Sequence, residues 1–319
     1  MELSTIHAQL PQTLDAVDLD LPGTRHHGKV REAWARDGRR LLVTTDRVSA
    51  FDAVLTTIPF KGQVLNQLAL YWFNATRDLV PNHILSTPDP NAIVVRDLTP
   101  LKVEMVVRGY ITGNTSTSAW THYQKGVRDF CGNILPEGLR KDQQLEAPIV
   151  TPSTKAELGE HDESVSPAEI VRRGDVPKPI MDQLVEISLA LFQRGVEQAA
   201  RQGVILVDTK YEFGLDDQGR VTLMDEIHTP DSSRYWYADS YQELFEQGAE
   251  QRRIDKDHLR TWLAARGFTG DGPVPSIPDE VRVSTAQKYI EAFETLTGQP
   301  FLAEVGPVLE RLRAGLRDY

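Results

Sequence analysis

The residues best suited to chemistry lie at positions 203–236, which have the pattern of two strands joined by a tight turn. In the first strand, at 204–213, successive side chains point to opposite faces of a sheet. Asp208, Lys210 and Glu212 therefore share one face. Because two acids and a base are costly to bury without partners, we interpret this face as the wall of a polar cleft.

The second strand, at 221–227, supplies another carboxylate, Asp225. A hairpin closed either by residues 218–219 or by residues 216–219 places Asp225 on the face of Lys210 and Glu212, and a slip of one residue moves it away. Mg²⁺ prefers carboxylate oxygens, and a nearby ammonium neutralises phosphate or carboxylate oxygens. The pattern predicts a site for a magnesium-bound nucleotide, or else a surface hairpin with solvated cross-strand charge pairs.

Composition limits the class of protein. The 319 residues suffice for two domains or one large domain, and the net charge of -11 argues against general binding to nucleic acid or anionic membranes. Cys131 is the single cysteine, so no intramolecular disulfide forms and a reducing compartment is expected. Without a signal peptide or an apolar run of about 20 residues, we expect a soluble, cytoplasmic protein.

A second group of candidate residues lies near the beginning of the sequence. Gly28 is followed by Lys29 and Arg31 at alternate positions of a predicted strand. Two cations beside a glycine that allows close backbone approach suit a nucleotide phosphate, and a basic edge strand is the alternative. The charged segment 46–52, which ends in Asp52, is expected to be a ligand-contacting loop after a strand.

A third group surrounds an arginine in an apolar strand. Arg108, in a strand predicted at 101–110, either pairs with Glu104 or directs its planar guanidinium at a carboxylate or phosphate. The following loop, 111–120, is rich in hydroxyls and backbone donors, which suit anions and ordinary turns alike.

The stretch 135–163 is irregular and too long for a plain linker. It contains Lys155 and ends in a His-Asp-Glu cluster, in which Asp162 is expected to accept from an amine or hydroxyl. Apolar periodicity predicts helices at 63–75, 179–202, 240–253, 256–266, 279–297 and 303–316, and Ser166 begins a further helix.

Five ordered blocks of the chain resemble the SAICAR synthetase family, the phosphoribosylaminoimidazole-succinocarboxamide synthases. The blocks are HGKVREAW, TTDRVSAFD, VEMVVRGYITG, HDES, and LVDTKYEFG followed by MDEIHTPDSSRYW. Together they span about residues 24–236, two thirds of the chain, and five blocks in order are more specific than one motif. The helical part from 237 onward resembles the longer members.

The resemblance implies an α+β fold related to ATP-grasp and kinase-like nucleotide binders. It implies a β-rich N-terminal domain at about 1–100 and a larger α/β domain at 101–319 that includes the helical tail, with ATP and Mg²⁺ between them. The implied enzyme is a ligase of purine biosynthesis that joins carboxyaminoimidazole ribonucleotide (CAIR) to L-aspartate and cleaves ATP to ADP and phosphate. A monomer or homodimer is expected, with no nucleic-acid or membrane partner.

The resemblance also implies roles for individual residues. Nucleotide-binding roles fall on Lys29, Arg31, Glu104 and Lys155. Metal-binding roles fall on Glu212 and Asp225. Catalytic roles fall on Asp208, Lys210 and Asp162. Substrate-binding roles fall on Asp52, Arg108 and Arg234, together with Asn114 or Ser118.

Those two residues are alternatives because the family reads Thr-Gly-Ser where this chain has Thr112-Gly113-Asn114. Either Asn114 replaces the serine, or Ser118 takes its role after an insertion. The expected mechanism proceeds through an acyl phosphate that the aspartate amine attacks, with Asp208 or Asp162 as base. A small-molecule kinase and a non-catalytic nucleotide-binding module are the competing classes.

Overall fold

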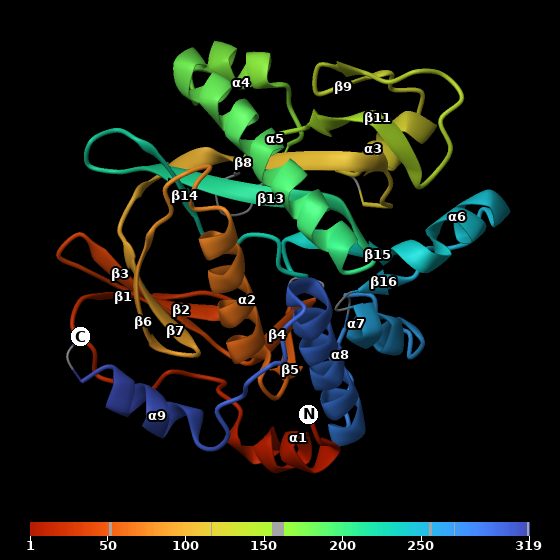
Figure 1. Ribbon diagram of the computed structural model, residues 1–319. Helices are drawn as coiled ribbons and strands as arrows, with labels where there is room; N and C mark the ends of the chain where they lie inside the picture. Colours follow the sequence, from red (N-terminus) through yellow and green to blue (C-terminus); the bar gives the residue numbers. More distant parts are fainter. Residues whose placement is uncertain (51–52, 116, 155–162, 255–256, 271, 318) are drawn as a thin grey trace. The chain divides into compact units, whose positions relative to one another are not determined.

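The computed structural model describes residues 1–50, 53–115, 117–154, 163–254, 257–270, 272–317 and 319 (Figure 1). Its helices and antiparallel sheets agree with the α+β class predicted from the sequence. By its internal contacts the chain forms two compact units. The first unit comprises 1–71, 83–97 and 255–319, and the second comprises 72–82 and 98–254.

The first unit contains a five-stranded antiparallel sheet. Its strand order is β1 (Thr24–His27), β2 (Arg31–Arg36), β3 (Arg39–Thr44), β7 (Ala92–Arg96) and β6 (Ile84–Asp89). A second, two-stranded sheet pairs β4 (Arg47–Ala50) with β5 (Ala53–Thr57). Within the charged segment expected as a loop at 46–52, residues 47–50 therefore form a strand, because their backbone groups pair with β5.

The helices of the first unit come from both ends of the sequence. They are α1 (Leu3–Gln9), most of α2 (Lys61–Ala75), α7 (Asp257–Ala264), α8 (Asp279–Thr297) and α9 (Val308–Gly315), with a 3₁₀ turn at Leu10–Gln12. Val308, Leu312 and Leu316 pack with Trp34 and Leu41 in one buried cluster. The C-terminal helices thus group with the N-terminal sheet and not with 101–319, because the apolar side of α9 covers that sheet.

A buried ion pair anchors α9. Arg311 Nε lies 3.0 Å from Asp89 Oδ2, and Arg311 Nη2 donates to Asn91 Oδ1 at 2.6 Å. Burial raises the pKa of Asp89, and the attraction of Arg311 opposes that rise. The ion pair and the hydrogen bond that Asn91 N donates to Asp89 Oδ1 at 2.8 Å thus offset part of the cost of burying this carboxylate.

Arg311→Ala is expected to lower the free energy of unfolding by about 2 kcal/mol, since it leaves Asp89 buried without its cation. Chemical denaturation of the full chain measures the change. Arg313→Ala removes an exposed arginine from the same helix and serves as the control. Equal stability of the two variants would contradict the anchoring role of the pair.

The second unit is built on a larger antiparallel sheet. Its main order is β11 (Gln143–Val150), β8 (Thr99–Ile111), β13 (Val204–Leu215), β15 (Ser233–Tyr237) and β16 (Arg253–Ile254). In addition, β12 (Ser153–Thr154) pairs with β8 and β14 (Val221–Met224) pairs with β13. The stretch expected to be irregular at 135–163 thus supplies β11 and β12, because β8 offers them a sheet edge.

Helices and a small hairpin complete this unit. They are α3 (Ala119–Gln124), α4 (Pro167–Arg173), α5 (Lys178–Arg201), α6 (Ala238–Gln247), β9 (Asp129–Phe130) and β10 (Asn133–Ile134). The predicted cap at Ser166 is confirmed, since its Oγ accepts from Glu169 N at 3.1 Å. The long helix α5 packs on β8 and β13, where Gly109 leaves room for the Phe192 ring. Among the described helices, none has the length and apolar character that crossing a membrane requires.

Candidate functional site

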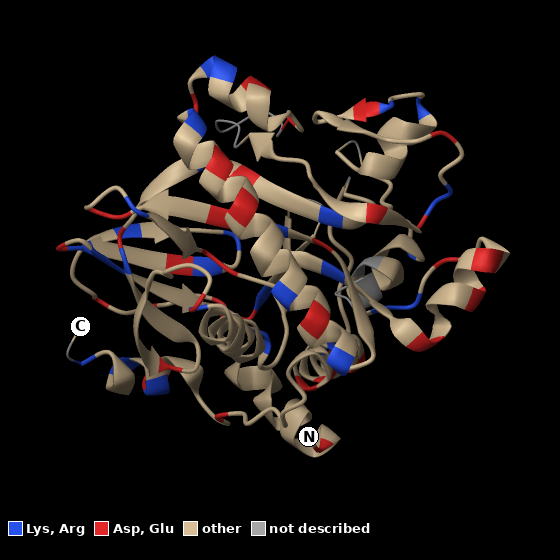
Figure 2. Ribbon diagram, turned by 45° about the horizontal axis from the view of Figure 1, so that its top comes forward, with Lys and Arg blue, Asp and Glu red and all other residues tan. Residues whose placement is uncertain are grey.

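Charged residues face one another across three neighbouring strands of the second unit. On the central strand β13, Asp208 lies directly opposite both Arg108 of β8 and Arg234 of β15. Because directly paired residues and alternate residues of one strand share a face, Lys210 and Glu212 lie on this face too. The predicted common face of the three β13 residues is confirmed, and Figure 2 shows both acidic and basic residues along these long strands. We call this surface the charged face.

Asp208 connects two arginines. Arg234 donates to it twice, from Nε to Oδ1 at 2.8 Å and from Nη2 to Oδ2 at 2.6 Å. Arg108 Nη1 donates to Oδ2 at 3.4 Å. One buried carboxylate thus holds two guanidinium groups side by side, and this part of the charged face keeps an excess positive charge.

Arg108 is further oriented from its other side. Its Nε donates to Thr151 Oγ1 at 2.8 Å, and its Nη2 donates to the main-chain oxygen of Thr117 at 3.3 Å. Burial lowers the pKa of Arg108, and the attraction of Asp208 opposes this shift. An arginine stays protonated in such a place, so the group remains a fixed cation. Of the two sequence alternatives, the pairing with Glu104 is wrong, because Arg108 pairs with Asp208.

Glu104 instead pairs with Lys210. The Lys210 Nζ lies 2.9 Å from Glu104 Oε1 and 2.5 Å from Glu212 Oε1. Glu104 and Glu212 are directly opposite on β8 and β13, where like charges repel. Burial disfavours the ammonium ion, but the attraction of Glu212 and Glu104 prevails and raises the pKa of Lys210 above its ordinary value. Lys210 therefore allows two carboxylates to lie together.

Gly113 brings the loop after β8 against the arginines. Its φ of 96° belongs to the left-handed region, and an added Cβ would lie 2.3 Å from Ser118 Oγ and 2.8 Å from Arg234 Nη1. Ser118 is buried and its Oγ accepts from Thr115 N at 3.1 Å, whereas Asn114 is exposed. The structure thus brings Ser118 close to Arg234, and the exposed Asn114 side chain lies in the same loop.

Asp225 does not lie in the strand expected at 221–227. The strand β14 ends at Met224, which pairs with Glu212, and Asp225 has a left-handed φ of 67°. Continued pairing would have placed Asp225 opposite Tyr211 and not on the face of Glu212, so the predicted register is wrong. Since the backbone turns at Asp225, strand alternation does not set the direction of its carboxylate. Within the described part of the chain, no group of three or more His, Cys, Asp or Glu side chains is arranged to hold a metal ion.

His228 stabilises the loop that follows β14, a role not predicted from the sequence. This buried histidine also has a left-handed φ, and its Nε2 shares a hydrogen bond of 2.6 Å with the Tyr211 hydroxyl. Trp72 packs edge-on against the imidazole at 4.6 Å, and Tyr235 Oη donates to the His228 carbonyl at 2.8 Å. No motif in the sequence distinguishes this histidine from an exposed loop residue.

The burial of His228 predicts a pH-dependent stability. Burial lowers its pKa from 6.5 to about 3, so the unfolded chain binds the proton more tightly. The buried, neutral imidazole therefore contributes fully to the free energy of unfolding above pH 6.5, and this contribution is lost as the pH falls toward 3. Over that range the free energy of unfolding changes with a slope approaching ~1.4 kcal/mol per pH unit. Unfolding free energies across this range should show a shallower slope for His228→Gln, while the exposed control His26→Gln follows the parent protein. If the free energy of unfolding changed with pH in the same way in all three proteins, His228 would not be the source of the pH dependence.

The predicted phosphate-binding residues of the first unit lie near a bend. Lys29 is exposed in the segment between β1 and β2, and Arg31 is half-buried at the start of β2. The buried Arg47 holds this bend, because its Nη2 and Nε donate to the carbonyls of Gly28 and Lys29 at 2.8 and 2.9 Å. Arg47 also pairs with Glu32 at 3.0 Å. The predicted site residues Asp52, Lys155 and Asp162 lie outside the described residues.

Comparison with known proteins agrees with the blocks seen in the sequence. The family model described as SAICAR synthetase matches residues 24–273. A phosphoribosylaminoimidazole-succinocarboxamide synthase of Legionella pneumophila is 48% identical over 300 residues, which are 93% of this chain and 96% of the relative.

Solved structures show the same fold. A SAICAR synthase from Saccharomyces cerevisiae complexed with SAICAR superposes with a TM-score of 0.80 at 34% identity, covering 91% of this chain and all of that chain. A type-2 SAICAR synthetase in complex with ADP has a TM-score of 0.65 at 23% identity, covering 88% of this chain and all of that chain, and supports the fold alone. On the family match and the sequence identity, the chain belongs to the SAICAR synthetase family.

Proposed function

We propose that this protein is the ATP-dependent ligase that joins CAIR to L-aspartate in purine biosynthesis, giving SAICAR, ADP and phosphate. The observation that carries the proposal is the charged face, where two arginines and a lysine are held by buried carboxylates. Family membership supports the reaction class, since a relative at 48% identity bears this enzyme's name. The SAICAR bound to the yeast neighbour supports the substrate class.

Arg108 and Arg234 are the proposed anion-binding groups for CAIR, which carries a carboxylate and a phosphate. Guanidinium groups match the planar geometry of such oxygens, and Asp208 orients both arginines before the substrate arrives. Ser118 lies beside Arg234 and supplies a hydroxyl donor for the same anion. The charged face thus contributes preformed donors without reorganisation during the reaction.

A carboxylate does not condense with an amine at neutral pH because its oxygen is a poor leaving group. In the proposed mechanism a CAIR carboxylate oxygen attacks the γ-phosphorus of ATP, and ADP leaves. The aspartate amine then attacks the acyl phosphate, and inorganic phosphate departs with its bonding electrons from a tetrahedral intermediate. Lys210 stabilises the negative charge on the transferring phosphoryl group.

The proposed base removes a proton from the attacking amine. Both oxygens of Asp208 already accept hydrogen bonds from arginines, which favours an orienting role for Asp208. Asp162 stays the predicted base, together with the predicted substrate contact of Asp52. Lys29, Arg31, Glu104 and Lys155 stay the predicted nucleotide-binding residues.

Magnesium binding is proposed for Glu212 and Asp225. The donor type fits a hard cation, because both side chains are carboxylates and Glu212 lies on the charged face. When bound, Mg²⁺ would neutralise phosphate charge on the nucleotide. Our proposal also includes a reducing, cytoplasmic location and a monomer or homodimer.

The decisive experiment is a coupled ADP-release assay with the purified chain. ADP release should require CAIR, L-aspartate and Mg²⁺ together, and each omission should reduce the rate to background. ADP release without L-aspartate would identify a small-molecule kinase instead. Nucleotide binding without any ADP release would identify a non-catalytic module.

Ser118→Ala is expected to raise the KM for CAIR roughly tenfold, because one hydrogen bond to a charged group is lost. Asn114→Ala, which removes an exposed side chain from the same loop, is the matched control and should leave KM within about twofold. Steady-state rates over a range of CAIR concentrations measure both. If Asn114→Ala raised the KM for CAIR more than Ser118→Ala did, Asn114 would be the residue that takes the role of the family's serine.

A further inference from the structure

Three arginines lie in a row on one face of the first unit's sheet. Arg36 of β2 is directly opposite Arg39 of β3, and Arg39 is directly opposite Arg96 of β7. Like charges at directly opposed positions destabilise a sheet, and no general need for positive charge explains them in a chain of net charge -11. We call these three residues the arginine row.

The arginine row has few internal counter-charges. Arg36 Nε donates to Asp37 Oδ2 at 2.9 Å, and its Nη1 donates to the main-chain oxygen of Tyr319 at 3.3 Å. Among the described residues, Arg39 and Arg96 have no ion pair and no side-chain hydrogen bond. Two of the three cations are therefore available to an anion from solution.

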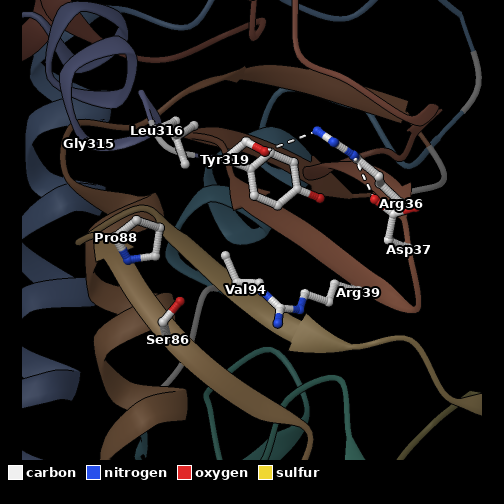
Figure 3. Close-up of a pocket in the computed structure, with 9 residues that line it drawn as sticks. All are labelled: Arg36, Asp37, Arg39, Ser86, Pro88, Val94, Gly315, Leu316 and Tyr319. Atoms are coloured by element: carbon white, nitrogen blue, oxygen red, sulfur yellow. Dashed lines mark hydrogen bonds and ion pairs between the residues drawn. The ribbon is translucent and has the colours of Figure 1, made fainter.

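A pocket lies beside the arginine row. It has a volume of about 510 Å³, and Arg36, Arg39 and the carboxylate of Asp37, which pairs with Arg36, border it on one side. Figure 3 shows the Tyr319 ring facing the space that Arg39, Val94 and Pro88 also border. This volume lies in the range of sites for small molecules.

The apolar side of the pocket is rigid. The Tyr319 hydroxyl accepts from Leu41 N at 3.1 Å and donates to the Trp34 carbonyl at 3.0 Å, so the ring is held in place. At the other end, α9 approaches β6 closely, because a Cβ added to Gly315 would lie 2.7 Å from the Pro88 carbonyl. The pocket thus joins a fixed aromatic and aliphatic wall to a cationic rim.

We propose that this pocket binds a phosphomonoester with a compact ring, of the size of a nucleoside monophosphate. Arg39 lines the pocket and contacts the phosphate, and Arg96, which is directly opposite Arg39 on β7 but does not line the pocket, adds its positive charge. The ring lies against Tyr319 and Pro88. All of these residues belong to the first unit, whereas the charged face belongs to the second. The proposed site is therefore additional to the ligase site, and its existence does not depend on the ligase assignment.

Equilibrium binding of AMP at moderate salt tests this proposal, with adenosine as the probe that lacks phosphate. The parent protein is expected to show two classes of AMP site, one of which is weakened at least tenfold in R39Q/R96Q. The matched control is R40Q, because Arg40 lies next to Arg39 on the opposite face of β3 and pairs with the exposed Asp97. R40Q should retain both classes.

A local measurement separates the two sites. AMP should protect Arg39 from phenylglyoxal in the intact protein, as read by peptide mass spectrometry, and adenosine should not. Unchanged AMP binding in R39Q/R96Q, absent protection of Arg39, or equal binding of adenosine would each overturn the proposal. R39Q/R96Q should release ADP at the rate of the parent protein. Because ADP release is assayed separately from AMP binding, a failure of the proposed AMP site can be distinguished from a failure of the proposed ligase function.

Discussion

Lys210→Met should lower kcat roughly 10³-fold while the protein stays folded. Removing a preorganised cation from a site of developing phosphate charge costs about this much. The substitution also leaves Glu104 and Glu212 directly opposite each other without the ammonium that lies within 2.9 Å of both. The uncompensated negative charge of these two carboxylates would also repel an anionic substrate.

Steady-state ADP release measures this effect, and far-ultraviolet circular dichroism checks the fold. Lys102→Met serves as the control, since it removes an exposed lysine from β8, the strand that also carries Glu104. If Lys210→Met kept more than about a tenth of the parent kcat, the proposed role of the ammonium in stabilising transferred phosphate would be wrong.

Asp208→Asn should impair both binding and stability. The variant loses the negative charge between two arginines, of which Arg108 is almost fully buried. Breaking a buried charge pair from one side costs about 3 kcal/mol, because the remaining cations are left close together. Arg234 also loses its bidentate contact with a carboxylate and Arg108 loses its single one, so kcat/KM for CAIR should fall about 10²-fold or more.

Chemical denaturation and CAIR-dependent kinetics test the two effects together. Asp217→Asn is the matched control, because Asp217 is an exposed residue in the turn that follows the same strand. A variant with parent stability and parent kcat/KM would exclude Asp208 as the residue that positions Arg108 and Arg234. A loss of kcat/KM with unchanged stability would show that the buried charge pair contributes to catalysis alone.

The sequence predicted the charged face because the relevant information is local. Alternation along β13 places Asp208, Lys210 and Glu212 on one side whatever the strand pairs with. Apolar periodicity likewise predicted α5 and α8 closely, since an amphipathic helix needs only one strip of apolar residues. The five ordered blocks identified the family for the same reason, because each is a short continuous segment.

Other features depended on pairing and packing between distant segments. The left-handed turn at Asp225 and the closeness of Ser118 to Arg234 follow from how β14 ends and how the loop at Gly113 meets Arg234. The grouping of α9 with the N-terminal sheet and the direct pairing position of Arg39 and Arg96 follow from contacts across more than 50 residues. A chain's local pattern specifies which side chains share a face, but long-range hydrogen bonding and side-chain packing decide which faces meet, so only the tertiary structure assigned each charge its partner.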